Sequence, residues 1–156
     1  MAIDPAELKW YRSTTVDDTT SNGGVINTGA EITTNSAENI FPDVTNAQRV
    51  TGVTQYRKIF LYNNNADTYT DILGWISTNT PATNSAISIV KGTASDTQAD
   101  ADDYTYVSPD SAVHADVLDL DSLAEDASVA IWIKRVITAS GLGYTNDTFT
   151  ISVTDT

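Results

Sequence analysis

The chain has no cysteine among its 156 residues and only one histidine, His114. The lack of cysteine excludes a disulfide framework and a thiolate metal site. The scarcity of histidine argues against a nucleophile paired with a base, because His114 lies in a polar stretch far along the chain from any poised serine. A glycine-rich phosphate loop and an HExxH motif are also absent. We therefore expect a protein that is not an enzyme and that needs no cofactor.

Basic residues are scarce as well. Lysine and arginine number 8 against 21 acidic residues, which gives a net charge of −13. A surface of this sign repels phosphate groups, so the composition predicts neither a nucleic-acid partner nor an anionic membrane surface. Three interpretations fit the charge: a solvated exterior, an acidic face that meets a basic partner, or a site that collects divalent cations.

Long hydrophobic runs are missing too. No apolar stretch approaches the ~20 residues that span a bilayer, and residues 1–5 show neither the basic region nor the apolar run of a signal peptide. The sequence thus predicts synthesis and solubility in a host cytoplasm. A chain of 156 residues fits one domain, or one domain with an arm.

The clearest pattern that is present lies in residues 128–138, SVAIWIKRVIT. Successive side chains there fall on two sides with the period of two that is typical of a pleated strand, and β-branched residues and an aromatic fit a surface with at least one buried face. The alternation places two sets of side chains on opposite faces: Val129, Ile131, Ile133, Arg135 and Ile137 on one, and Ala130, Trp132, Lys134, Val136 and Thr138 on the other. We expect this segment to be the central strand of the domain.

Other segments repeat this pattern over shorter lengths. Strands are predicted at 53–62, 69–77, 85–91, 104–107 and 148–154. Gly74, inside the second of these, predicts a bulge or a close backbone approach. In the last of them Phe149, Ile151 and Val153 are expected to point inward, as in an antiparallel sheet with one solvated face. Six candidate strands without a long helix indicate an all-β sandwich or barrel.

The first 24 residues differ from the rest. Residues 13–24 are polar and rich in turn formers, and Asn22-Gly23 is a strong tight-turn signal. We therefore divide the chain into an N-terminal extended arm, residues 1–24, and a β-domain, residues 25–156. Leu8, Trp10 and Tyr11 are apolar anchors on this arm, which are expected to pack either on their own domain or on a neighbouring chain at a protein interface.

Several other side chains invite a functional interpretation. Two acidic groups lie in segments predicted as loops: Asp100, Asp102 and Asp103, and then Asp116, Asp119 and Asp121. Most clusters of this kind are solvated, so we expect no metal centre, although calcium at either group stays open. Trp75 and Trp132 could stack on sugar rings, but their apolar neighbours favour burial in the core.

Five stretches together carry a resemblance to a known family. They are NGGVI at 22–26, NIFPDV at 39–44, QYRKIFLYN at 55–63, AIWIKR at 130–135 and NDTFTI at 146–151. Together they resemble a family of small virion structural proteins of tailed bacteriophages.

The resemblance implies an antiparallel β-sandwich of jelly-roll type on the capsid exterior of a virion. It implies a decoration or cement protein, in which homotrimers bind the major capsid protein and stabilise the shell, or alternatively a tail or neck component. Two hypotheses from other classes remain: a carbohydrate-binding or adhesin module that uses Trp75 or Trp132, and a hydrolase that uses Asp119 and Asp121, which we rank last.

Overall fold

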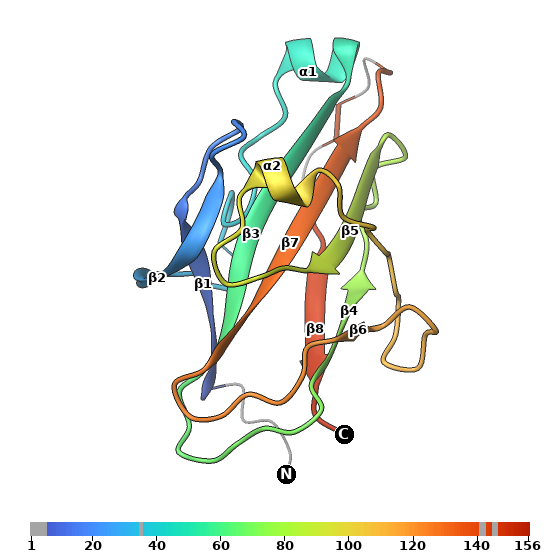
Figure 1. Ribbon diagram of the computed structural model, residues 1–156. Helices are drawn as coiled ribbons and strands as arrows, with labels where there is room; N and C mark the ends of the chain where they lie inside the picture. The colour runs from blue at the N-terminus through green and yellow to red at the C-terminus, as the bar shows by residue number, and fades with distance from the viewer. Residues whose placement is uncertain (1–5, 35, 141–142, 145–146) are drawn as a thin grey trace.

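The structure is a computed structural model that describes residues 6–34, 36–140, 143–144 and 147–156. These residues form two antiparallel sheets and two short helices (Figure 1). The larger sheet has the order β2-β1-β3-β7-β5, with bounds Gly23–Glu31, Leu8–Thr15, Val53–Asn63, Ser128–Ile137 and Ser85–Lys91. The smaller sheet has the order β6-β4-β8, with bounds Leu118–Asp119, Leu73–Thr78 and Thr150–Thr154. The all-β prediction is confirmed.

Strand β7 is central, as its alternation predicts. It pairs with β3 from Val53↔Ile137 to Tyr62↔Ser128 and with β5 on its other side. Val129, Ile131 and Ile133 point into the main core. Trp132, on the opposite face, is 0% exposed. Both faces of this strand are therefore covered.

The main core contains side chains from both sheets. Ile59, Ile89 and Ile131 come from the larger sheet, and Ile76 and Leu118 from the smaller one. Loop residues complete the cluster: Phe41, Tyr69, Ile72, Leu120 and Leu123. Phe149, Ile151 and Val153 pack against it with partial exposure, so the inward set predicted for the last strand is confirmed.

The described part of the predicted arm, residues 6–24, belongs to the larger sheet rather than extending away from it. Strand β1 lies between β2 and β3 and pairs with β3 from Leu8↔Asn63 to Arg12↔Ile59. The physical reason is that β1 carries its own buried residues, such as Leu8, and needs a sheet to bury them. Residues 1–5 lie outside the described residues.

The structure differs from the expected strand at 104–107 and agrees with the expectation for Gly74. Residues 104–107 do not form a strand, because only Val107 makes an isolated bridge, to Ile89. Gly74 does mark a close approach: a Cβ atom there would lie 2.9 Å from Cδ1 of Leu120.

The two helices are short and lie in connecting segments. Helix α1, Asn46–Thr51, begins with a capping box in which Thr45 and Gln48 exchange hydrogen bonds between side chain and backbone. Helix α2, Gln98–Ala101, lies in front of β3 and β7 in Figure 1, on the face opposite the main core. Within the described residues no helix is long and apolar enough to cross a membrane.

Candidate functional site

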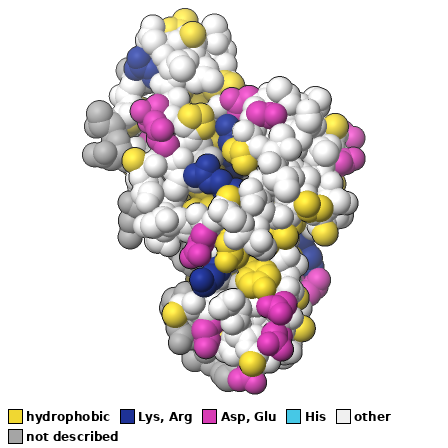
Figure 2. All heavy atoms as spheres, turned by 90° about the vertical axis from the view of Figure 1, so that its left-hand side faces the viewer, with side chains coloured by type: hydrophobic (Ala, Val, Ile, Leu, Met, Phe, Trp, Pro, Cys, Tyr) yellow, Lys and Arg dark blue, Asp and Glu magenta, His cyan; other side chains and the backbone are white. Residues whose placement is uncertain are grey.

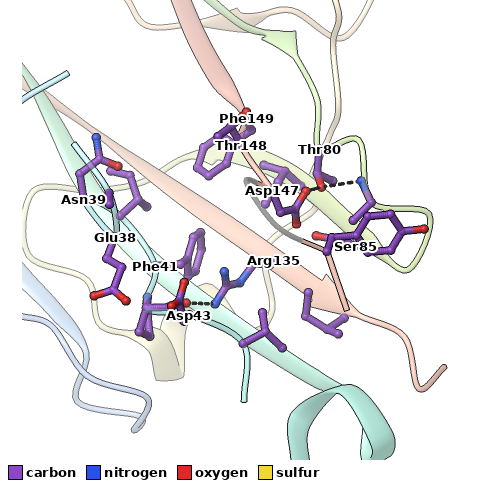
Figure 3. Close-up of a pocket in the computed structure, with 18 of the residues that line it drawn as sticks. Glu38, Asn39, Phe41, Asp43, Thr80, Ser85, Arg135, Asp147, Thr148 and Phe149 are labelled. Carbon is purple, nitrogen blue, oxygen red and sulfur yellow. Dashed lines mark hydrogen bonds between the residues drawn. The ribbon is translucent and has the colours of Figure 1, made fainter. Parts of the chain in front are cut away.

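A groove of about 960 Å³ opens between the two sheets. One wall is formed by β8, the end strand of the smaller sheet, and another by the described residues of the segment 32–44, which leave out residue 35. Its floor is apolar, with Ile59, Ile87 and Ile137 from the larger sheet. Phe41 and Phe149, labelled in Figure 3, both line the groove and form an aromatic pair with ring centroids 6.2 Å apart. A groove of this kind can accept apolar side chains from a partner.

Arg135 of β7 is a buried basic group of the groove, which Arg49 of α1 also lines. Its Nη2 donates to the carbonyl oxygen of Pro42 at 2.8 Å, and its Nε donates to Oε1 of Gln55 at 3.1 Å (Figure 3 shows the first contact). The guanidinium carbon lies 4.4 Å from the centroid of the Phe41 ring, a cation–π contact. These contacts attach the segment that contains Phe41 and Pro42 to the sheet.

A second arginine, Arg57, lies near Arg135 and adds to the effect of burial in lowering its pKa. Arg57 of β3 also faces the Phe41 ring, at 5.4 Å, and donates from Nη1 to Oδ1 of Asp18 at 2.8 Å. Burial, and then the neighbouring charge of Arg57, lower the pKa of Arg135 to about 10. The carboxylates of Asp147, Asp18 and Asp43 act in the opposite direction. The charge of Arg135 is therefore already balanced in part by these three carboxylates.

The rim of the groove is acidic. Glu38, Asp43 and Asp147 line it and are exposed. In Figure 2, which faces the β2 side of the molecule, acidic side chains likewise surround basic and hydrophobic ones. Together with the net charge of −13, this rim favours a partner with basic residues around an apolar segment.

The three predicted interface residues fall in different environments. Leu8 is 6% exposed and belongs to the main core, and Tyr11 is 8% exposed and packs with Phe60 and Ala130 on the opposite face of the sheet. Only Trp10 is half-buried and lines the groove. Leu8 and Tyr11 thus follow the alternative in which the anchors pack on their own domain.

The remaining candidates lie apart from the groove. Trp132 is fully buried, as expected, so it offers no surface to a sugar ring, whereas Trp75 is only half-buried. Asp119 and Asp121 are exposed, and Asp121 pairs with Lys91 at 2.5 Å. Among the residues that the structure describes, no three acidic or histidine side chains gather where they could hold a metal ion.

A second polar cluster lies on the opposite face of the larger sheet. The side chains of Lys58 on β3 and Asp96 in the loop before α2 are 0% and 3% exposed and form an ion pair through Nζ and Oδ1. Oδ2 of Asp96 accepts hydrogen bonds from the Thr93 amide at 2.9 Å and the Tyr104 hydroxyl at 2.8 Å. Sequence analysis predicts nothing of this cluster, because 92–103 has the composition of a solvated loop. The one signal is that Lys58 lies between Tyr56 and Phe60 on the same face of β3.

The phenol of Tyr104 provides a pH-dependent test of this second cluster. Burial, followed by its hydrogen bond to Asp96, raises the pKa of Tyr104 to about 12. Because the pKa in the folded state lies above the unfolded value, its contribution to stability is full below pH ~10 and is lost as the pH rises through about 12. Burial also raises the pKa of Tyr106, so near-ultraviolet titration of tyrosinate should show a late phase that Tyr104→Phe reduces by one phenol. An early titration of all tyrosines would contradict the burial of this phenol.

Comparison of the chain with protein-family models, with curated proteins and with solved structures finds no match.

Proposed function

We propose that this protein is a structural component of a tailed-bacteriophage virion, which binds the outside of the capsid and stabilises it as a decoration or cement protein. The proposal includes the finer architecture: the two sheets are the layers of an antiparallel β-sandwich of jelly-roll type. It also includes a homotrimer that contacts the major capsid protein. A tail or neck position is the alternative within the same class.

The observation that carries the proposal is the groove between the sheets. It combines an apolar floor with a half-buried tryptophan, Trp10, and both lie within an acidic rim. Tryptophans in such positions are enriched among the residues that dominate binding energy at protein interfaces. We assign the groove to an extended segment of the major capsid protein that carries apolar side chains flanked by basic ones. The net charge of −13 supports this choice, because complementary charge steers association and excludes other partners.

The stabilising effect follows from binding alone. A protein that binds the assembled shell, but not its dissociated subunits, shifts the equilibrium toward assembly in proportion to its occupancy. No reaction is required. The acidic exterior suits this position, because it keeps the protein away from packaged DNA.

Replacing Trp10 with alanine tests the docking site. Co-sedimentation with undecorated capsids should show at least about 30-fold weaker binding of Trp10→Ala, because an interface anchor of this kind contributes about 2 kcal/mol or more. The wild-type protein should also raise the temperature at which capsids release their contents, and Trp10→Ala should not.

Trp75→Ala is the matched control, since Trp75 is also a half-buried tryptophan on a strand but does not line the groove. Circular dichroism of both variants verifies that they fold. Equal capsid binding by the two folded variants would contradict the assignment of the groove as the docking site.

A further inference from the structure

We propose that the side chains of Lys58 and Asp96 join in an intramolecular amide bond. This inference does not rest on the proposed function. The Nζ atom of Lys58 is in direct contact with Oδ1 of Asp96. Nζ also donates to the carbonyl oxygens of Gly24 at 2.7 Å and of Asp96 at 3.1 Å, and these two bonds hold it against the carboxyl group. A nucleophile held in this way reacts as if its partner were present at very high concentration.

The two carboxyl oxygens of Asp96 are placed for different roles. Oδ2 accepts from the Thr93 amide and the Tyr104 hydroxyl, so it has two donors where negative charge develops when Nζ attacks Cγ. Within the described residues, Oδ1 has no hydrogen-bond donor other than the Lys58 ammonium that it contacts. Oδ1 is thus the oxygen that is free to leave.

The reaction balances without any other reagent. The ammonium first transfers one proton to Oδ1, which gives a neutral amine and a carboxylic acid. Nζ then attacks Cγ, and the charge of the tetrahedral intermediate collects on Oδ2. A second proton passes from nitrogen to Oδ1, the Cγ–Oδ1 bond breaks, and one water molecule leaves. The products are an amide and water, with no change in oxidation state.

Burial lowers the pKa of Lys58 and so favours the neutral amine that attacks. Burial acts on Asp96 in the opposite direction, but hydrogen bonds from Lys58, Thr93 and Tyr104 outweigh it and lower the pKa of that carboxyl group, so the first proton transfer is the uphill step. Both side chains are almost completely withdrawn from solvent, and Nζ lies 5.0 Å from the Phe60 ring centroid and 5.8 Å from that of Trp132. An apolar site disfavours separated charges and protects an amide from hydrolysis.

Two glycines make room for this arrangement. A Cβ atom at Gly23 would lie 2.8 Å from the carbonyl oxygen of Asp96, and one at Gly92 would lie 3.1 Å from its Oδ2. Both would also come within 2.8 Å of the Trp132 ring. Any side chain at either position would therefore press on the loop that holds Asp96 against Lys58.

The bond would connect β3 to the loop before α2. Figure 1 shows that this loop and α2 lie across the face of β3 and β7, and the loop is otherwise held by backbone contacts such as Gly24 N to Asp96 O at 2.9 Å. A covalent connection between segments far apart in sequence restricts the unfolded chain, as a disulfide does, in a protein without cysteine.

Intact-mass spectrometry of the denatured full chain tests the proposal. The wild-type mass should be lower than the sequence mass by one water, about 18 Da, whereas Lys58→Arg should have its full sequence mass. Asp103→Asn, a change at an exposed position in the same segment, should keep the loss. After proteolysis, the peptide that contains Lys58 should be found joined to the one that contains Asp96.

The digest separates this bond from other losses of water. Dehydration within a single peptide, such as a succinimide, would give the same intact mass but no joined pair. A wild-type chain at its full sequence mass, or a loss of water confined to one peptide, would overturn the proposal.

Discussion

Asp96→Ala is expected to lower the free energy of unfolding by about 3–5 kcal/mol, because it leaves the ammonium of Lys58 buried without its anionic partner. The carboxylate it removes pairs with Lys58 and accepts hydrogen bonds from Thr93 and Tyr104. Removing it therefore leaves both donors unsatisfied as well. Where the proposed amide bond has formed, Asp96→Ala removes that bond in place of the ion pair and likewise leaves the Lys58 ammonium buried without a partner. Urea unfolding monitored by circular dichroism measures the change.

Two variants give this prediction its controls. Asp103→Ala removes a carboxylate from the same segment at an exposed position, so its effect should stay within about 0.5 kcal/mol. The double variant Lys58→Met with Asp96→Ala should be more stable than Asp96→Ala alone, because no unpaired charge remains. If Asp96→Ala were no worse than Asp103→Ala, the buried pair would not contribute to stability.

Trp132→Ala is expected to lower the free energy of unfolding by about 3–5 kcal/mol, the range for replacing a large aromatic side chain in a well-packed core. Trp132 is fully buried although it lies on the face of β7 opposite the main core. Its ring is covered at Gly23 and Gly92, where no space for a Cβ atom exists. The rigid backbone at these two glycines limits collapse into the cavity that alanine would leave.

The comparison with Trp75→Ala makes this result interpretable. Trp75 is half-buried on β4, so it buries less apolar surface on folding than Trp132 does. In the same urea experiment, Trp75→Ala should therefore lower the free energy of unfolding by clearly less than Trp132→Ala. Equal losses for the two variants would show that the outer face of β7 is not tightly covered.

The sequence predicts the strands of this fold well where one pattern dominates. The alternation in 128–138 predicts both faces of β7, and the inward set Phe149, Ile151 and Val153 is found against the core. Local alternation suffices there because the period of two fixes which side chains are buried. The pairing of β1 with β3 is not local, because β3 begins only at Val53. The pattern of the eight residues of β1 shows that they are extended but does not show which strand they pair with.

The site was predictable only in part. The sequence identifies Trp10 as an apolar anchor, and Trp10 lines the groove. Leu8 shares the core face of β1 with Trp10 but is buried in the main core, whereas Tyr11 faces the opposite side because neighbouring strand positions alternate. The segment 32–44, which forms one wall of the groove, shows no periodic pattern, and its position depends on contacts such as that of Pro42 with Arg135. The pair of Lys58 and Asp96 depends on long-range packing as well, and composition alone makes Asp96 indistinguishable from solvated neighbours.

Electron microscopy of undecorated capsids mixed with the purified protein is the most direct test of the central claim, that this chain works by binding a shell of another protein. The account predicts attachment at regular positions on the outer surface, in groups of three, with the groove beside β8 turned toward the capsid protein. Bare capsids after mixing, together with intact virions that lack the protein, would contradict it.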